Sequence, residues 1–248
     1  MKNRNYEALQ VWLKKESREA NRFQKVTDRF QKYVQGFIPD KIQDAITKGM
    51  EGFTRLVMTG SGIKLPKTDA HLSLDQRELL SQKEIENAVH LGMLSGAGTS
   101  AGGIITSLMD LPILMSFKIK LIFEIGSHFG YDLKDPKERY FAMLIFREAF
   151  SNATLKKQHL RALIEFESRR ETLENPLETI DWKGFQQEYR DYIDLAKLLQ
   201  IIPGIGIVIG AGVNRQLLLH LGETAINAYR LRYFQKHPEN RFDITKTP

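Results

Sequence analysis

The sequence contains no cysteine and no apolar run that would make a simple membrane span. Without cysteine the chain has no disulfide, no thiolate zinc site and no cysteine nucleophile, which favours a reducing compartment. The N-terminus also lacks the apolar run of a secretory signal. The more apolar stretches are interrupted by charges such as Asp110, Lys118 and Glu124, or fall short of the ~20 residues that a spanning helix needs. We therefore expect a cytoplasmic protein that can lie peripherally at the inner membrane face.

The motifs of several enzyme classes are missing as well. There is no Gly-Lys-Ser/Thr of a phosphate-binding loop, no His-Glu-x-x-His zinc motif and no Gly-x-Ser-x-Gly nucleophile turn. Residues 96–101 match the spacing of a dinucleotide-binding turn, but a helical pattern precedes them where that turn needs a strand. The six histidines are scattered along the chain. We predict no cofactor and no metal site.

Helical periodicity is what the sequence does contain. Apolar residues recur at intervals of three and four, and no stretch alternates as a strand would. The pattern predicts an all-α fold, a single compact bundle of long helices. We divide the chain into a basic N-terminal helix (1–38), a helical domain (39–236) and a polar tail (237–248). The expected helices are 6–37, 39–59, 74–94, the apolar helix that carries Asp110 (104–125), 136 to a break at 152, 155–173, 182–199 and 207–234.

Two of these helices begin with specific capping chemistry. Ser73 and Gln76 have the spacing of a capping box, in which each side chain bonds the backbone N–H of the other residue. Asp135 precedes Pro136 and Glu138, which is a capping residue followed by the proline and the acid that favour a first helical turn. We expect helices to begin at both positions.

The N-terminal helix carries a basic strip. Residues 1–33 hold nine Lys/Arg against four Asp/Glu, so they contribute +5 of the net charge of +6. Six of these cations fall on one narrow face, nearly opposite the apolar face: Lys15, Arg18, Arg22, Lys25, Arg29 and Lys32. Such a row suits anionic lipid headgroups, although a solvated bundle face is an equal alternative. Nucleic acid is the weaker alternative, because no aromatic residues interleave with the cations.

Two Gly-rich stretches form helix junctions, one from Gly92 into the uncharged segment before Asp110 and one at 201–214. Small residues recur in them at a spacing of four, which allows two helix backbones to approach closely. The pairs are Gly92 with Gly96, Gly98 with Gly102, and Gly206 with Gly210. We expect the two stretches to pack on each other.

Asp110 is an acid among apolar neighbours, so it needs a partner or a raised pKa. It could pair with an arginine or with Lys118 or Lys120, cap the helix that restarts at Pro112, or act as an acid or base. Pairing or capping is the favoured interpretation. A catalytic site would draw on five candidate residues: Asp110, His128, Asp132, Arg139 and Asn214.

The chain resembles the EcsC family, which comprises helical bacterial proteins. The shared features are the Gly-rich lead, the Asp110 helix, Gly130-Tyr131-Asp132 with Pro136 and Glu138-Arg139, Pro203 to Gly206, Asn214, and Tyr229 to Arg232. They extend over about 84–234. Lys118 and Lys120 depart from the pattern, which has arginine at those positions. The resemblance implies an all-helical fold and a place beside an ABC transporter.

We therefore expect a non-enzymatic protein that acts at the inner membrane surface or on a membrane complex associated with an ABC transporter. The alternative is an enzyme built on the five candidate residues. The two hypotheses differ in what they require of those residues. An enzyme should bring several of them to one pocket that solvent reaches, whereas a binding protein should hold them in separate structural contacts.

Overall fold

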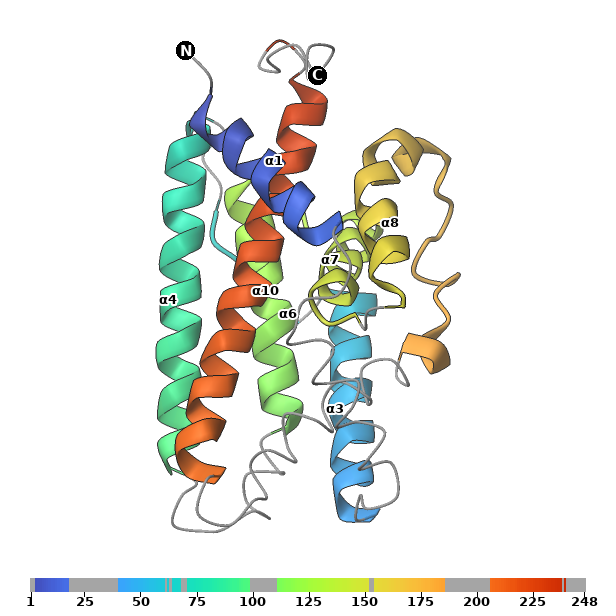
Figure 1. Cartoon of the computed structure of the whole chain (residues 1–248). Coiled ribbons are helices and arrows are strands. Elements are labelled where there is room, and N and C mark those ends of the chain that lie inside the picture. The colour runs from blue at the N-terminus through green and yellow to red at the C-terminus, as the bar shows by residue number, and fades with distance from the viewer. Residues whose placement is uncertain are drawn as a thin grey trace.

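The computed structural model describes residues 3–17, 40–60, 62, 64–67, 71–98, 111–151, 154–185, 206–237 and 239. These residues are mostly helical, and no strand occurs among them. The prediction of an all-α fold is therefore confirmed. In chain order the elements are α1 (Arg4–Ser17), α3 (Asp40–Thr59), α4 (Leu74–Gly98), α6 (Leu111–His128), α7 (Pro136–Ala149), α8 (Lys156–Arg169), the 3₁₀ turn η2 (Arg170–Thr172) and α10 (Gly206–Lys236) (Figure 1).

Most helix boundaries agree with the sequence prediction. α3 begins one residue after the expected position, and α10 extends the expected 207–234 by one residue at its start and two at its end. α4 continues four residues past the expected end at 94. The last turn of the helix expected at 155–173 tightens into η2. The remainder of the expected helix 6–37 after Ser17, and residues 186–199 of the helix expected from 182, lie outside the described residues.

Both predicted capping sites are present. The backbone N–H of Ser73 donates to Gln76 Oε1 at 2.9 Å, and the N–H of Gln76 donates to Ser73 Oγ at 3.3 Å. The reciprocal pair satisfies two of the N–H groups that a helix start leaves without partners. Asp135 Oδ1 accepts from the N–H of Lys137 at 2.8 Å, and Pro136 follows as the first residue of α7.

The end of α6 positions the start of α7. Gly130 has a φ of 91°, which favours glycine. Its N–H donates to the carbonyl of Ser127 at 2.9 Å, and the N–H of Tyr131 donates to that of Gly126 at 3.0 Å. These bonds form a Schellman motif, which terminates the helix and turns the chain sharply. The turn directs Tyr131 back toward α10, where its ring stacks on Tyr229 with centroids 5.3 Å apart.

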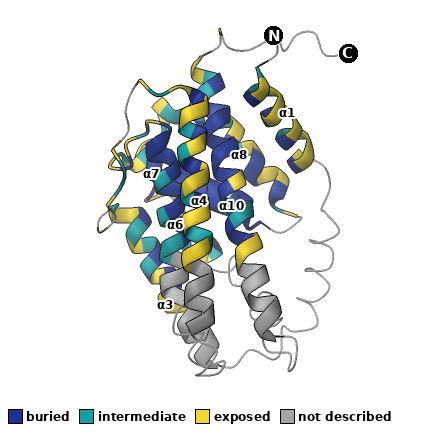
Figure 2. Cartoon of the chain, turned by 90° about the vertical axis from the view of Figure 1, so that its left-hand side faces the viewer, coloured by how far each residue is buried: buried dark blue, intermediate teal, exposed yellow. Residues whose placement is uncertain are grey.

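The helices pack around one shared core. α4, α6 and α10 lie side by side, α3 lies on the other side of α6, and α7 packs against α3, α6, α8 and α10 (Figure 1). α4 and α10 approach closely at Gly222, where an added Cβ would stand 2.4 Å from Ile85 Cδ1. α1 crosses the outside of α10 and also contacts α8. Buried residues fill α7 and α10, while α1 keeps an exposed outer face (Figure 2).

The Gly-rich helix ends meet at one end of the bundle. The last turns of α4, the first turns of α10 and the start of α6 all lie at the lower end of Figure 1. The expectation that the two Gly-rich stretches pack on each other stays a prediction, because the side-chain surroundings of these residues are not described. Among the described residues, no helix combines the length and the apolarity that crossing a membrane requires.

Candidate functional site

Two clusters of charged side chains are buried where α7, α8 and α10 meet. We call the first the Arg232 centre; it comprises Arg232, Glu138, Glu167, Arg170 and Asp135. We call the second the Lys156 centre; it comprises Lys156, Glu16, Glu148 and His220. Burying charge is costly unless each ion is paired, so clusters of this kind are the first place to look for function.

Arg232 is completely buried, with 0% of its side chain exposed. Its two terminal nitrogens donate to the two oxygens of Glu138 at 2.5 and 2.9 Å, and its Nε donates to Glu167 Oε2 at 2.7 Å. The guanidinium also lies 3.8 Å from the ring centroid of Tyr131 and 4.5 Å from that of Phe141. The paired and stacked geometry is one that arginine provides and lysine does not.

The Arg232 centre extends outward until each carboxylate has a cation. Arg170 donates to Glu138 at 3.1 Å and to Asp135 at 2.6 Å, and Lys236 lies 3.2 Å from Glu167. Burial works to raise the pKa of Glu167, but Arg232 and Lys236 outweigh it and hold the pKa below its ordinary value. Burial likewise works to lower the pKa of Arg232, and the bonds to Glu138 raise it instead. Because its charges are fixed, this centre is suited to holding α7, α8 and α10 together.

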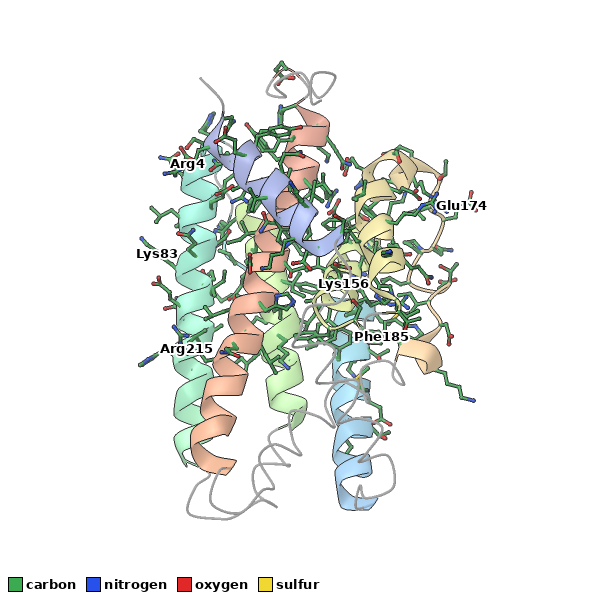
Figure 3. The ribbon with its side chains drawn as sticks, viewed as in Figure 1. Arg4, Lys83, Lys156, Glu174, Phe185 and Arg215 are labelled. Atoms are coloured by element: carbon green, nitrogen blue, oxygen red, sulfur yellow. The ribbon has the colours of Figure 1, made fainter. Side chains whose placement is uncertain are left out.

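The Lys156 centre has one buried cation for two carboxylates, and the exposed Lys15 lies 4.0 Å from Glu16 Oε1 at its edge. Lys156 Nζ contacts Glu16 Oε2 of α1 directly and lies 3.8 Å from Glu148 Oε1 of α7. All three side chains are less than a tenth exposed. Neither carboxylate oxygen of Glu148 accepts a hydrogen bond from a described residue. Lys156 lies below the end of α1, beside the junction of α7 and α8 (Figure 3).

This shortage of positive charge changes how the carboxyl of Glu148 ionises. Burial raises the pKa of Glu148 to about 8, Lys156 opposes that rise, and Glu16 adds to it. Two histidines lie on the neighbouring helices, His159 buried on α8 and His220 half-buried on α10. Burial lowers the pKa of His220, whose Nε2 lies 3.1 Å from the carbonyl of Ala149, and it lowers the pKa of His159 to about 4. At neutral pH the centre therefore holds a protonated carboxyl next to one ion pair.

The structure gives the described catalytic candidates separate partners. His128 Nε2 lies 3.1 Å from Glu84 Oε1. Asp132 is exposed, and its carboxylate accepts from the N–H of Lys134. Arg139 donates to the carbonyls of residues 57, 58, 133 and 134 at 2.6–3.0 Å, so it caps the end of α3. Burial lowers the pKa of Arg139, against the effect of the nearby Asp135 and Asp132.

The other predicted site residues are placed only in part. Asn214 lies in α10, but its side chain is not described. Gly92, Gly96 and Gly98 lie in α4, and Gly206 and Gly210 lie in α10. Lys15 is exposed in α1 and pairs with Glu223 of α10 at 3.3 Å. The residues outside the described part are Asp110, Gly102, Arg18, Arg22, Lys25, Arg29 and Lys32.

The sequence analysis did not select the residues of either buried centre as site residues. A signal for the first was present in the helical stripes. Buried positions of α10 recur at Leu221, Ala225, Tyr229 and Arg232, so the arginine falls on the apolar stripe. Glu138 falls on the buried stripe of α7 in the same way. Asp110 stands out because its neighbours in sequence are apolar, whereas Glu138 and Arg232 stand out only where a helical face is traced.

The chain was also compared with known proteins. The model of the EcsC protein family matches residues 3–234, which include α1 as well as both buried centres. Protein EcsC of Bacillus subtilis (strain 168) is 37% identical over 231 residues, covering 93% of this chain and 94% of that protein. The protein named Uncharacterized protein YdbA, from the same organism, is 31% identical over 148 residues, or 59% of this chain and 54% of its own. No solved structure matches the chain. With a family match over nearly its whole length, this chain belongs to the EcsC family.

Proposed function

We propose that this chain is a non-enzymatic protein that attaches to the anionic inner surface of a membrane and works there beside a membrane complex, an ABC transporter being the partner that the family resemblance implies. The observation that carries the proposal is the placement of charge. Residues 1–33 supply +5 of the net +6, so the remainder of the chain is nearly neutral. A basic segment of this kind is attracted to anionic lipid by about 1 kcal/mol for each cation near the surface.

The remainder of the chain supports the assignment of lipid contact to the basic N-terminal segment. Its buried cations are occupied by partners within the fold: Arg232 by Glu138, and Arg230 by Glu78 at 2.6 and 2.8 Å. The cations of the basic strip therefore remain the natural contacts for an anionic surface. The Gly-rich ends of α4 and α10 would serve as a packing or shallow-insertion element.

The alternative, an enzyme, gains no support from the described candidates. His128, Asp132 and Arg139 each have a structural partner of their own, and one of those partners is a set of helix-end carbonyls. A catalytic role for Asp110 or Asn214 stays a hypothesis, since their side chains are outside the description.

Flotation with lipid vesicles tests the proposal. The parent protein should float with vesicles that contain phosphatidylserine or phosphatidylglycerol and stay behind with neutral phosphatidylcholine vesicles. Reversing Arg18, Arg22, Lys25 and Arg29 to Glu should abolish flotation, because four attractive contacts become repulsive. Binding should also weaken steeply as salt rises, since surface attraction is screened.

A second charge-reversed variant provides the matched control. Lys83, Lys134, Lys157 and Lys183 are exposed on the body of the protein, and reversing them to Glu gives the same net charge. This variant should keep most of its binding if the N-terminal strip is the contact. Equal loss in both variants would show a general charge effect and contradict the assignment to the strip.

A further inference from the structure

The contacts of α1 show a helix attached mainly along one apolar face. Leu9 and Trp12 are buried against the bundle, and the ring of Tyr6 meets Phe234 of α10 edge-on at 5.1 Å. Polar contacts hold the two ends of the helix: Asn5 donates to Asp75 of α4 at 2.6 Å, and Glu16 pairs with Lys156 of α8. Val11 on the outer face is 70% exposed. α1 thus covers the bundle from outside.

The Glu16–Lys156 pair would ordinarily fix such a helix in place. Removing one partner of a buried ion pair leaves an uncompensated charge, which is strongly destabilising. Arg230 and Glu78 illustrate that case: the carboxylate accepts two bonds from one guanidinium, and together they join α10 to α4. Neither helix of that pair could move away without stranding a charge.

Lys156 differs because a second carboxylate is already beside it. Glu148 Oε1 stands 3.8 Å from Lys156 Nζ, and neither of its oxygens has a hydrogen-bond donor among the described residues. Glu148 belongs to α7 and Lys156 to α8, so both stay in the core if α1 leaves. If the Glu148 carboxyl gives up its proton to solvent as Glu16 leaves, a small movement of the ammonium would exchange Glu16 for Glu148, and no buried cation would be left alone.

We infer that α1 is a membrane-binding helix stored against the bundle, and that the exchange of Lys156 from Glu16 to Glu148 permits its release onto an anionic lipid surface. The inference rests on the proposed function and adds a second lipid contact to the basic strip. That contact is the apolar face of α1 that is now buried.

The composition of α1 fits a helix lying in the membrane interface. Tyr6, Leu9 and Trp12 share one face, and Lys14 and Lys15 lie in the last turn. Tryptophan and tyrosine favour the level of the headgroups because their rings are apolar with one polar atom. Cations beside such a face attract anionic lipid. Lys15 now pairs with Glu223 in an exposed bridge, a contact of little strength that release would break.

Trp12 offers a direct reading of the docked state. The chain has two tryptophans, so a Trp182→Phe background leaves Trp12 as the single indole fluorophore. Docked, Trp12 is 3% exposed and should be quenched weakly by acrylamide. On vesicles rich in phosphatidylserine it should become accessible to quenchers carried by the lipid chains. Far-UV circular dichroism checks in each case that the bundle stays helical.

Two substitutions in the Trp182→Phe background test the roles of Glu16 and Glu148 separately. Glu16→Gln weakens the docking of α1 on the bundle. Without vesicles, the acrylamide quenching constant of Trp12 should therefore rise at least twofold. Vesicle binding should tighten several-fold, because less free energy is needed to release α1. Glu148→Gln removes the second partner. It should leave quenching without vesicles unchanged and weaken vesicle binding about tenfold. The double variant, Glu16→Gln with Glu148→Gln, leaves Lys156 without either carboxylate partner. Its denaturation midpoint should fall by more than the sum of the two single changes.

The outcomes distinguish the two proposals. If the parent does not bind anionic vesicles, the proposed function fails and the stored-helix inference fails with it. If the parent binds while Trp12 stays inaccessible to lipid-borne quenchers, the function stands and the inference is wrong. Equal vesicle binding by Glu148→Gln and the parent, or additive effects in the double variant, would overturn the exchange of Lys156.

Discussion

The Arg232 centre and the Lys156 centre are both buried, and they solve the problem of buried charge differently. In the first, Glu138 and Glu167 share Arg232, and Arg170 and Lys236 complete the pairing. In the second, one lysine lies between two carboxylates from different helices. A guanidinium presents a fixed fork of donors, whereas an ammonium is a compact charge on a flexible stem.

The difference shows which helices are built to remain together. The Arg232 centre joins α7, α8 and α10, the helices that also contain the aromatic stack of Phe141, Phe166 and Tyr229. The Lys156 centre joins α1 to that group through a contact that has an alternative. Removing a residue from the first centre should therefore destabilise the whole fold. A change in the second should appear first in its dependence on pH.

The largest loss in the free energy of unfolding should follow from Arg232→Met. The substitution leaves Glu138 and Glu167 buried with only part of their compensating charge, so we expect a loss of about 3–5 kcal/mol in the free energy of unfolding. Urea denaturation followed by circular dichroism measures it. Arg161→Met is the control, because Arg161 pairs with Glu165 on the exposed face of α8 and should change stability little. Similar midpoints for the two variants would show that the Arg232 centre does not secure the fold.

A smaller effect, confined to a pH window, should follow from Glu148→Gln. The folded-state pKa of Glu148 is raised by burial to about 8 from an ordinary value of 4.5. The folded protein therefore keeps a proton that the unfolded chain loses, and this contribution to stability is complete below pH 4.5 and lost as pH rises to about 8. Glutamine does not titrate. The variant should match the parent near pH 4.5 and exceed it by a few kcal/mol at pH 8.5, because each pKa unit corresponds to about 1.4 kcal/mol.

The measurement is the difference between parent and variant at each pH, taken from urea denaturation curves. His159 titrates in the opposite sense in an overlapping range, because burial lowers its pKa to about 4. The difference cancels that contribution, since both proteins keep His159. A difference that stays constant from pH 4.5 to 8.5 would mean that the pKa of Glu148 is not raised in the fold.

Local chemistry explains why the helices could be predicted. The capping residues at Ser73 and Asp135 act within three positions of themselves, so their effect is visible in the sequence. α4 continues four residues past the predicted end, into its Gly-rich stretch. Glycine has a poor helix propensity, so the sequence pattern predicts an earlier end. A contact with another helix is not visible in a pattern of three- and four-residue intervals.

The candidate site could be predicted only in part, for the same reason. The bond between Glu138 and Arg232 joins residues 94 positions apart. Arg232 falls on the apolar stripe of α10, but the stripe does not show which helix it packs against or which carboxylate it meets. Arg139 looked like a catalytic candidate and caps α3 instead, with carbonyls from residues 57 and 58. Which element a charged residue faces is decided by topology.

The smallest loss in the free energy of unfolding should come from substitution of Tyr131, whose ring packs on the guanidinium of Arg232. Its ring lies 3.8 Å from the Arg232 guanidinium and stacks on Tyr229. Tyr131→Leu keeps an apolar side chain but removes the ring face, and we expect a loss of about 1–2 kcal/mol in the free energy of unfolding. Tyr131→Phe keeps the ring and should stay within about 0.5 kcal/mol of the parent. Urea denaturation distinguishes the two. If Phe is as damaging as Leu, the hydroxyl matters more than the ring, and the stacking of Arg232 contributes little to the difference between the two centres.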